Sequence, residues 1–100
     1  MLSMFELDEC RKHIDNTSLA LYKLSKELRH DISIMEGDIV TSRKIGLSFA
    51  ADEMEKKKQH LESMLQDYEQ LQRMCEKAVS NIDDTKIDAQ YLKSMYPHSR

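Results

Sequence analysis

Residues that form turns and sheets are scarce in this chain of 100 residues. It contains 2 Gly, 1 Pro and no Trp, and aromatic residues make up only 6%. A β-sheet needs aromatic and β-branched runs separated by turns that contain Gly or Pro, so all-β and α/β folds are all but excluded. The length also excludes the usual nucleotide-binding and barrel enzymes, which need a larger domain.

Signals for targeting, disulfide bonding and nucleic acid binding are also lacking. The first residues carry acidic side chains and no apolar run, which predicts a cytoplasmic protein without a membrane span, whose export would be independent of a signal peptide. Two cysteines, Cys10 and Cys75, are too few for a disulfide framework. The formal net charge is −3, so we expect no nucleic acid partner.

The composition favours long amphipathic helices, because charged residues make up 33% of the chain and hydrophobic residues 40%. Apolar or small residues recur at steps of three and four and indicate a heptad pattern. They are Leu7, Cys10, Ile14, Thr17, Leu21, Leu24, Leu28, Ile32 and Met35. Gly37 then stands where a left-handed C-terminal cap is expected, so the pattern predicts a helix over about 4–36.

The next segment, 37–48, contains both glycines of the chain and is the predicted connector. Ser48 is the predicted N-cap of a second helix over about 49–83. Asp38 and Thr41 are alternative caps for an earlier start.

The second helix repeats the heptad pattern of the first. Its apolar or small residues are Leu61, Met64, Tyr68, Leu71, Cys75, Ala78, Ile82 and Thr85. Thr85 and Asp88 resemble a capping box, which predicts a short tail helix over about 86–95. Pro97 is expected to end it.

Residues 1–100 are therefore predicted to form a single all-α domain, an antiparallel two-helix hairpin of coiled-coil type with a short C-terminal helix. The midpoint of the predicted connector gives facing residues whose numbers add to about 85. This register places Cys10 and Cys75 at the same level of the hairpin. Two helices bury little apolar surface, so we expect assembly into a helical bundle as a dimer or a larger homo- or hetero-oligomer.

A second apolar face is predicted from residues that a two-helix seam leaves unused. They flank the seams or lie in the predicted connector, and they include methionine, whose side chain adapts to different partners. The candidates are Leu19, Tyr22, Ile39, Val40, Ile45, Leu47, Phe49, Leu65, Met74 and Val79. We expect a helical protein partner or a second copy of the chain at this face.

Two spacings raise the question of a metal site. Cys10-x-x-His13 with Cys75 offers three zinc ligands, and Glu27-x-x-His30 has the spacing of di-iron bundles. A fourth zinc ligand and a second Glu-x-x-His pair are missing, so we expect surface side chains and no metal or cofactor. The sequence also lacks a phosphate-binding loop, a nucleophile elbow and an HExxH motif, so no catalytic residue and no enzyme activity are predicted.

Basic side chains gather near the predicted hairpin tip. They are Arg43, Lys44, Lys56, Lys57 and Lys58. Two interpretations stay open, a contact with an anion, a lipid headgroup or nucleic acid, and a solvated helix start neutralised by nearby acidic residues. No aromatic residue interleaves the cluster, which argues against stacking on bases.

The layout resembles the WXG-type helical hairpins of type VII secretion, which have a similar length, two helices and a mid-chain break. The local match is Met35-Glu36-Gly37, with Met35 where that family has Trp. The resemblance implies a secretion partner, chaperone or targeting subunit that dimerises with a helical partner. The alternative from the residues themselves is a structural coiled-coil subunit of a cytosolic complex, such as a tether or cytoskeletal adaptor.

Overall fold

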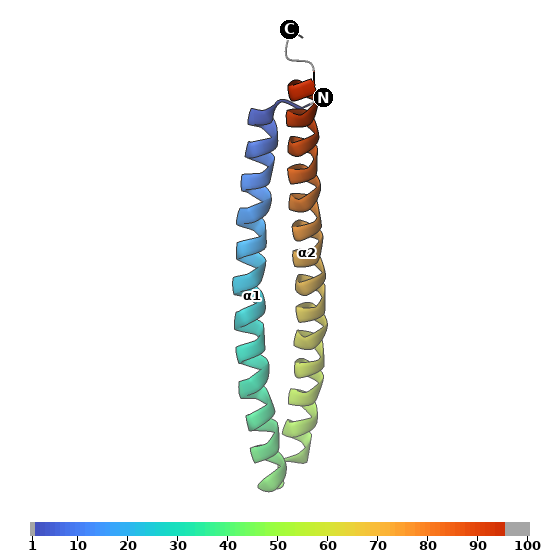
Figure 1. Ribbon diagram of the computed structural model, residues 1–100. Helices are drawn as coiled ribbons and strands as arrows, with labels where there is room; N and C mark the ends of the chain where they lie inside the picture. The colour runs from blue at the N-terminus through green and yellow to red at the C-terminus, as the bar shows by residue number, and fades with distance from the viewer. Residues whose placement is uncertain (1, 96–100) are drawn as a thin grey trace.

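The computed structural model describes residues 2–95, which form two long helices (Figure 1). α1 spans Met4–Lys44 and α2 spans Ser48–Met95. They run antiparallel, side by side, in a rod with extents of 80 × 16 × 14 Å. The radius of gyration is 22.5 Å, whereas a compact domain of this length has about 13 Å. The predicted all-α hairpin is confirmed.

α1 begins at an N-cap, Ser3, that the heptad pattern did not reveal. The Oγ of Ser3 accepts a hydrogen bond from the N–H of Glu6 at 3.1 Å and donates to Glu6 Oε1 at 3.2 Å. The carbonyl of Ser3 accepts from the N–H of Leu7 at 3.0 Å. The first bond satisfies the N–H of Glu6, which the first helical turn leaves without an intrahelical partner, and the bond from Leu7 is the first of the helix.

The turn between the helices is a Schellman motif centred on Gly46. Gly46 has a φ of +84°, in the left-handed region that favours glycine. The N–H of Leu47 donates to the carbonyl of Ser42 at 2.8 Å, and the N–H of Gly46 donates to the carbonyl of Arg43 at 3.3 Å. The connection therefore consists of residues 45–47 alone.

The predicted helix end at residue 36 and connector over 37–48 are wrong, because Gly37 lies inside α1. A glycine in a helix interior costs only about 1 kcal/mol relative to Ala. The continued helix buries Ile39, and Ala51 is buried on α2 near the same turn. This packing near the turn outweighs the low helix propensity of one glycine.

α2 continues through the predicted break, so the separate tail helix is not present. The Oγ1 of Thr85 donates to the carbonyl of Asn81 at 2.9 Å, within the helix, and does not cap a new one. Lys86 forms an ion pair with Asp8 of α1, which holds this stretch of weak helix formers in place. The predicted stop at Pro97 lies outside the described residues.

Five ion pairs between the helices define the register. They are Asp8–Lys86, Arg11–Asp83, Arg29–Glu69, Glu36–Lys58 and Arg43–Asp52. The residue numbers in each pair add to 94, 95 or 98, so the predicted value of 85 is wrong, because the turn lies closer to the C-terminus than predicted. Cys10 is level with Asp84, which is nine residues or roughly 14 Å along the axis from Cys75.

The side chains between the helices follow a regular alternation of four and three residues. On α1 they are Leu7, Arg11, Ile14, Ser18, Leu21, Ser25, Leu28, Ile32, Met35, Ile39 and Ser42. On α2 they are Ala51, Met54, Lys58, Leu61, Leu65, Tyr68, Gln72, Cys75, Val79, Ile82, Lys86 and Ala89. Apolar residues alone fill the seam of α1 from Leu28 to Ile39, whereas polar residues alternate with apolar ones from Arg11 to Ser25.

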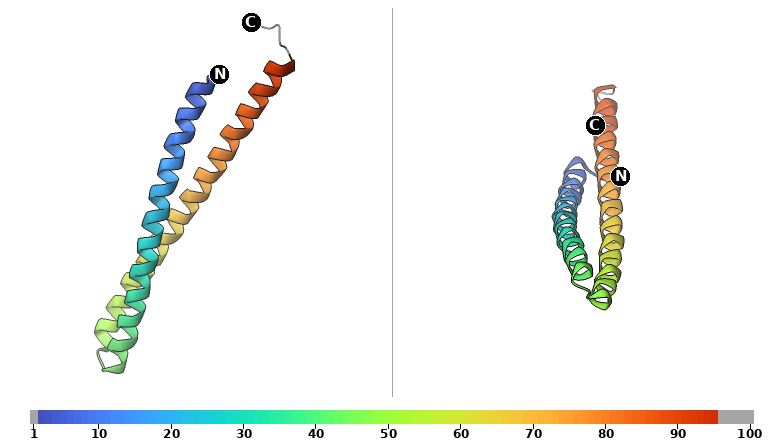
Figure 2. Two further views of the ribbon diagram at one scale, coloured as in Figure 1. Left: turned by 60° about the vertical axis from the view of Figure 1, so that its left-hand side comes forward. Right: turned by 90° about the horizontal axis from the view of Figure 1, so that it is seen from below.

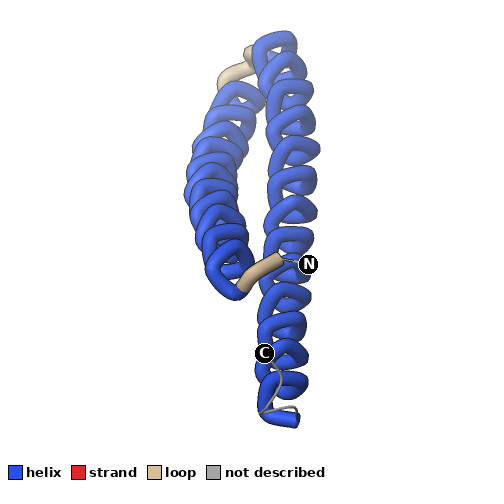
Figure 3. The backbone as a smooth tube through the Cα atoms, turned by 90° about the horizontal axis from the view of Figure 1, so that it is seen from above, coloured by secondary structure: helices blue, strands red, loops and turns tan. Residues whose placement is uncertain are grey.

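The packing is accordingly tighter near the turn than near the termini. We call residues 4–24 with 71–95 the outer half of the rod, and residues 25–70 the turn half. Of the five buried apolar residues among residues 2–95, four lie in the turn half, namely Leu28, Ile32, Ile39 and Ala51, and Leu7 is the fifth. In the left-hand view of Figure 2 the two helices overlap nearer the turn and spread toward the termini. α2 also continues past the start of α1 (Figure 3).

Candidate interaction surface

One side of the rod is charged and joins the two helices. This charged flank carries Asp8, Arg11, Asp15, Arg29, Glu36 and Arg43 on α1 and Asp52, Glu55, Lys58, Glu62, Glu69, Asp83 and Lys86 on α2. All five ion pairs between the helices within residues 2–95 lie on it. Most of these side chains are largely exposed, so each pair contributes little to stability and serves mainly to set the register.

Two cations of the charged flank have a raised pKa. The hydrogen bond to Asp83 raises the pKa of Arg11, and the negative charges of Asp83 and Asp15 raise it further. A hydrogen bond to Glu55 raises the pKa of Lys58 above its ordinary value of 10.5, partial burial opposes the shift, and neighbouring carboxylates add to it. Both side chains therefore stay protonated across the neutral range.

The opposite side of the rod is apolar along the outer half. We call it the apolar flank, and its residues each lie one position before a core position, except Leu92, which lies one heptad after Thr85. In the outer half they are Cys10, Thr17 and Leu24 on α1 and Leu71, Ala78, Thr85 and Leu92 on α2, and Met64 on α2 extends the flank into the turn half. Leu24 is 43% exposed and Leu71 is 45% exposed. The heptad pattern placed all of these except Leu92 in the hairpin's own seam, and that placement is wrong.

In the outer half the seam of α1 is rotated relative to the predicted one, because one continuous helix can present only one heptad phase to its neighbour. In the turn half the apolar residues Leu28, Ile32 and Ile39 select that phase. The same phase continued toward the N-terminus brings Ser25 to the core, with 1% exposure, and its Oγ has no hydrogen-bond partner among the described residues. Leu24 is thereby turned about 100° away from the seam.

The apolar flank is hollowed into a groove between the helices in the outer half. The groove has a volume of about 310 Å³. It is lined by Ile14, Thr17 and Leu21 on α1 and by Leu71, Met74, Cys75 and Ala78 on α2. The hydroxyl of Thr17 already donates to the carbonyl of His13 at 3.0 Å. The lining therefore offers apolar contact and little hydrogen bonding.

The residues predicted for a partner face fall into several different environments. Ile39 is buried between the helices at 6% exposure, so it belongs to the core and not to an exposed face. Leu65 and Val79 are half-buried core residues, and Met74 lines the groove. Leu19 and Tyr22 are about half exposed on α1, outside the apolar flank, and Val40, Ile45, Leu47 and Phe49 are exposed at the turn end.

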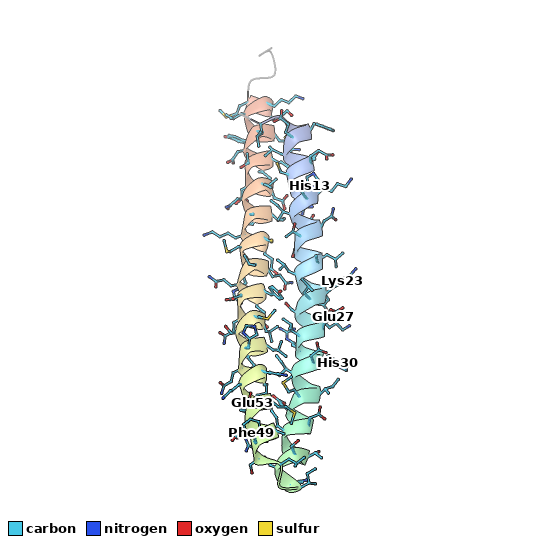
Figure 4. The ribbon with its side chains drawn as sticks, turned by 180° about the vertical axis from the view of Figure 1, so that it is seen from behind. His13, Lys23, Glu27, His30, Phe49 and Glu53 are labelled. Atoms are coloured by element: carbon cyan, nitrogen blue, oxygen red, sulfur yellow. The ribbon has the colours of Figure 1, made fainter. Side chains whose placement is uncertain are left out.

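The residues considered for a metal site do not come together. His13, Glu27 and His30 lie along the edge of α1 that points away from α2 (Figure 4). Cys10 and Cys75 are free thiols on different levels of the rod, so the predicted same-level pair is wrong. Within residues 2–95 no group of three or more His, Cys, Asp or Glu side chains is arranged to hold a metal ion.

The basic cluster near the turn is largely neutralised within the chain. Its ion pairs are Arg43–Asp52 at 3.2 Å, Lys56–Glu53 at 3.3 Å and Lys58–Glu55 at 3.3 Å. Lys44 and Lys57 form no ion pair with any described residue. These pairs favour the interpretation of a solvated helix start over a dedicated anion site.

Three charged residues continue the apolar flank toward the turn. Asp31 and Asp38 lie on α1 one and two heptads beyond Leu24, and Lys57 lies on α2 two heptads before Leu71. The register places Asp38 and Lys57 at the same level, yet the part of the chain that is described shows no ion pair for either. The predicted connector includes residue 38, so the sequence analysis does not pair Asp38 with Lys57. The spacing of Asp38 from Leu24, which is a multiple of seven residues, does indicate that the two share one face of a helix.

No protein-family model, curated protein or solved structure matches this chain. Neither α1 nor α2, as described, contains a stretch that is long and apolar enough to cross a membrane.

Proposed function

We propose that this protein is a non-enzymatic helical interaction module whose apolar flank pairs with a helical segment of another chain. The observation that carries the proposal is the contrast between the two flanks, one bridged by ion pairs and the other apolar, hollowed and open. Contiguous exposed apolar surface is uncommon on monomeric proteins and marks contact sites. A helix fits such a groove because packed helices insert rows of side chains between those of their neighbours.

The surface supports binding to another protein chain and not catalysis. A catalytic site needs a concave, partly dry cavity with a few convergent polar groups. The groove is open along the rod, and its one hydroxyl is already bonded to helix backbone. This supports a role in assembly.

The role we favour is that of a structural coiled-coil subunit in a cytosolic complex, such as a tether or adaptor. The rod is 80 Å long and exposes apolar side chains such as Phe5 and Phe49 near its opposite ends. A slender rod of this kind holds two partners apart.

A type VII secretion partner is the second candidate, and the two-helix layout supports it. Met35-Glu36-Gly37 lies inside α1, nine residues before the glycine of the turn, so this match lies away from the hairpin tip. Export of the intact chain into the culture medium of its own cells, with a cytosolic protein as the leakage control, would select this candidate.

Site-specific photo-crosslinking tests the proposed function. A photoreactive amino acid is placed at Leu24 or Leu71 on the apolar flank, and at Leu19 as the matched control, since Leu19 is a similarly exposed leucine of α1 outside the flank. In the native cell we expect crosslinks from Leu24 and Leu71 to a helical segment of a second polypeptide, and few from Leu19. Equal yields from all three positions would refute the proposal.

A further inference from the structure

We infer that the chain that covers the apolar flank is a second copy of this protein, with two hairpins packed side by side at the same level and α1 of each against α2 of the other. This inference rests on the proposed function and names its partner. In such a pair every helix has antiparallel neighbours, and one two-fold axis along the rod relates the copies.

The apolar residues of the flank match one another level by level in this arrangement. The register places Leu24 level with Leu71, and Thr17 level with Ala78. With α1 of one copy against α2 of the other, Leu24 faces the second copy's Leu71 and Thr17 faces its Ala78. At these two levels a large side chain meets a large one and a small side chain a small one, while one heptad nearer the turn Asp31 faces the second copy's Met64.

Charge complementarity selects this arrangement over the inverted one. Asp38 and Lys57 end the flank toward the turn, and the described residues offer neither of them an ion pair. When the copies lie at the same level, Asp38 of each faces Lys57 of the other. When one copy is inverted, α1 lies against α1, and Asp38 faces apolar residues or solvent instead.

The available area is sufficient for a stable interface. The flank runs from Lys57 to Leu92, which is about 52 Å at 1.5 Å per residue. The rod is 14–16 Å across. These dimensions give roughly 800 Å² on each copy, the typical share of one partner in a specific protein–protein interface.

Mixed single-cysteine proteins test the arrangement. Cys10→Ser and Cys75→Ala remove the native thiols, and Thr17→Cys and Ala78→Cys are then introduced into separate proteins. We expect oxidation of the mixture to give a covalent heterodimer, identified by mass, while either protein alone gives little. A Thr17→Cys homodimer as the main product would show α1 packed on α1 and would overturn the inference.

Charge reversal gives an independent readout of the same contact. Asp38→Lys and Lys57→Glu should each weaken self-association about tenfold, because each creates two like-charged contacts across the two-fold axis. Mixing the two variants should restore association, since both contacts then join opposite charges. Failure of the mixture to recover would contradict the same-level arrangement.

Sedimentation equilibrium separates this inference from the proposed function. We expect a dimer whose dissociation constant rises roughly a hundredfold or more in Leu24→Glu/Leu71→Glu and changes less than about twofold in Leu19→Glu. If the purified chain stays monomeric but Leu24 crosslinks to a different protein in cells, the inference of a second copy is overturned. The proposed function is then intact. A monomer without such crosslinks overturns both.

Discussion

At the scale of single residues, the two glycines of the chain occupy opposite kinds of backbone position. Gly46 has a φ of +84° at the turn, where a side chain is strained. Gly37 lies in the regular helix α1, and a Cβ added there meets no atom within 4 Å. One glycine is required by the backbone, and the other only lowers helix propensity.

We therefore expect Gly46→Ala and Gly37→Ala to change stability in opposite directions. Gly46→Ala should destabilise the protein by about 1–2 kcal/mol, the cost of a left-handed conformation for an L-residue. Gly37→Ala should stabilise it by about 0.5–1 kcal/mol through better helix propensity. Urea unfolding followed by circular dichroism, at one protein concentration, measures both. Destabilisation by Gly37→Ala would indicate that Gly37, and not Gly46, forms the turn, and would contradict the structure.

Lys58 predicts how stability responds to alkaline pH. Its pKa in the folded chain is raised above 10.5 by the hydrogen bond to Glu55. The folded state thus holds this proton more tightly than the unfolded state, so the stabilisation is complete below pH 10.5 and is lost as pH rises through the folded pKa.

Lys58→Met should consequently reduce the loss of stability above pH 10.5 relative to the parent chain. Lys77→Met is the matched control, because Lys77 is exposed on α2 and forms no ion pair within residues 2–95. Thermal melts from pH 7 to 11 provide the measurement. Identical pH profiles for the parent chain and Lys58→Met would contradict the assigned role.

At the scale of the elements, the heptad pattern was sufficient to predict two antiparallel helices, because two long amphipathic stretches interrupted by glycine have few other solutions. It could not decide which glycine forms the turn. Both Gly37 and Gly46 satisfy the local requirements of a cap, and the choice depends on packing between residues distant in sequence, such as Ile39 and Ala51. The predicted register depends on which glycine forms the turn, and so does the prediction that Cys10 and Cys75 lie at the same level.

The apolar flank was only partly predictable for a related reason. The heptad pattern predicts Leu24 and Leu71 in the seam between the helices, whereas in the structure they lie on the same apolar stripe but outside that seam. The stripe in the outer half is wider than one neighbouring helix can cover. The sequence alone does not say which edge of it the hairpin uses, because the phase is set by residues of the turn half such as Ile32.

Charge reversal at Arg29 distinguishes the two registers directly. In the structure Arg29 lies 2.6 Å from Glu69, whereas the register first predicted would face it with Lys56. We expect Arg29→Glu to destabilise the chain and Glu69→Arg to rescue it, with a coupling energy of about 0.5–1 kcal/mol from a double-mutant cycle. Stabilisation by Arg29→Glu alone would point to Lys56 as the neighbour and would contradict the structure.

At the scale of the whole molecule, the chain is a rod whose turn half is more tightly packed than its outer half. Ion pairs hold one side of the outer half together, while its other side exposes apolar side chains to water. A second hairpin on that side would complete a four-helix bundle and would bury the residues that a single hairpin leaves exposed.

This coupling of folding to association predicts a melting temperature that depends on concentration. For a dimer that unfolds as one unit, a tenfold rise in protein concentration should raise Tm by roughly 3–6 °C. The dependence should vanish in Leu24→Glu/Leu71→Glu and persist in Leu19→Glu. A parent Tm that is independent of concentration would show that the hairpin folds alone.

Small-angle X-ray scattering of the purified protein on an absolute scale tests the central claim, that a second copy covers the apolar flank, most directly. The account predicts a mass twice the 11.7 kDa of one chain, together with a maximum dimension that stays near the 80 Å of one rod. A single-chain mass at every concentration, or a doubled mass with a much longer particle, would contradict it.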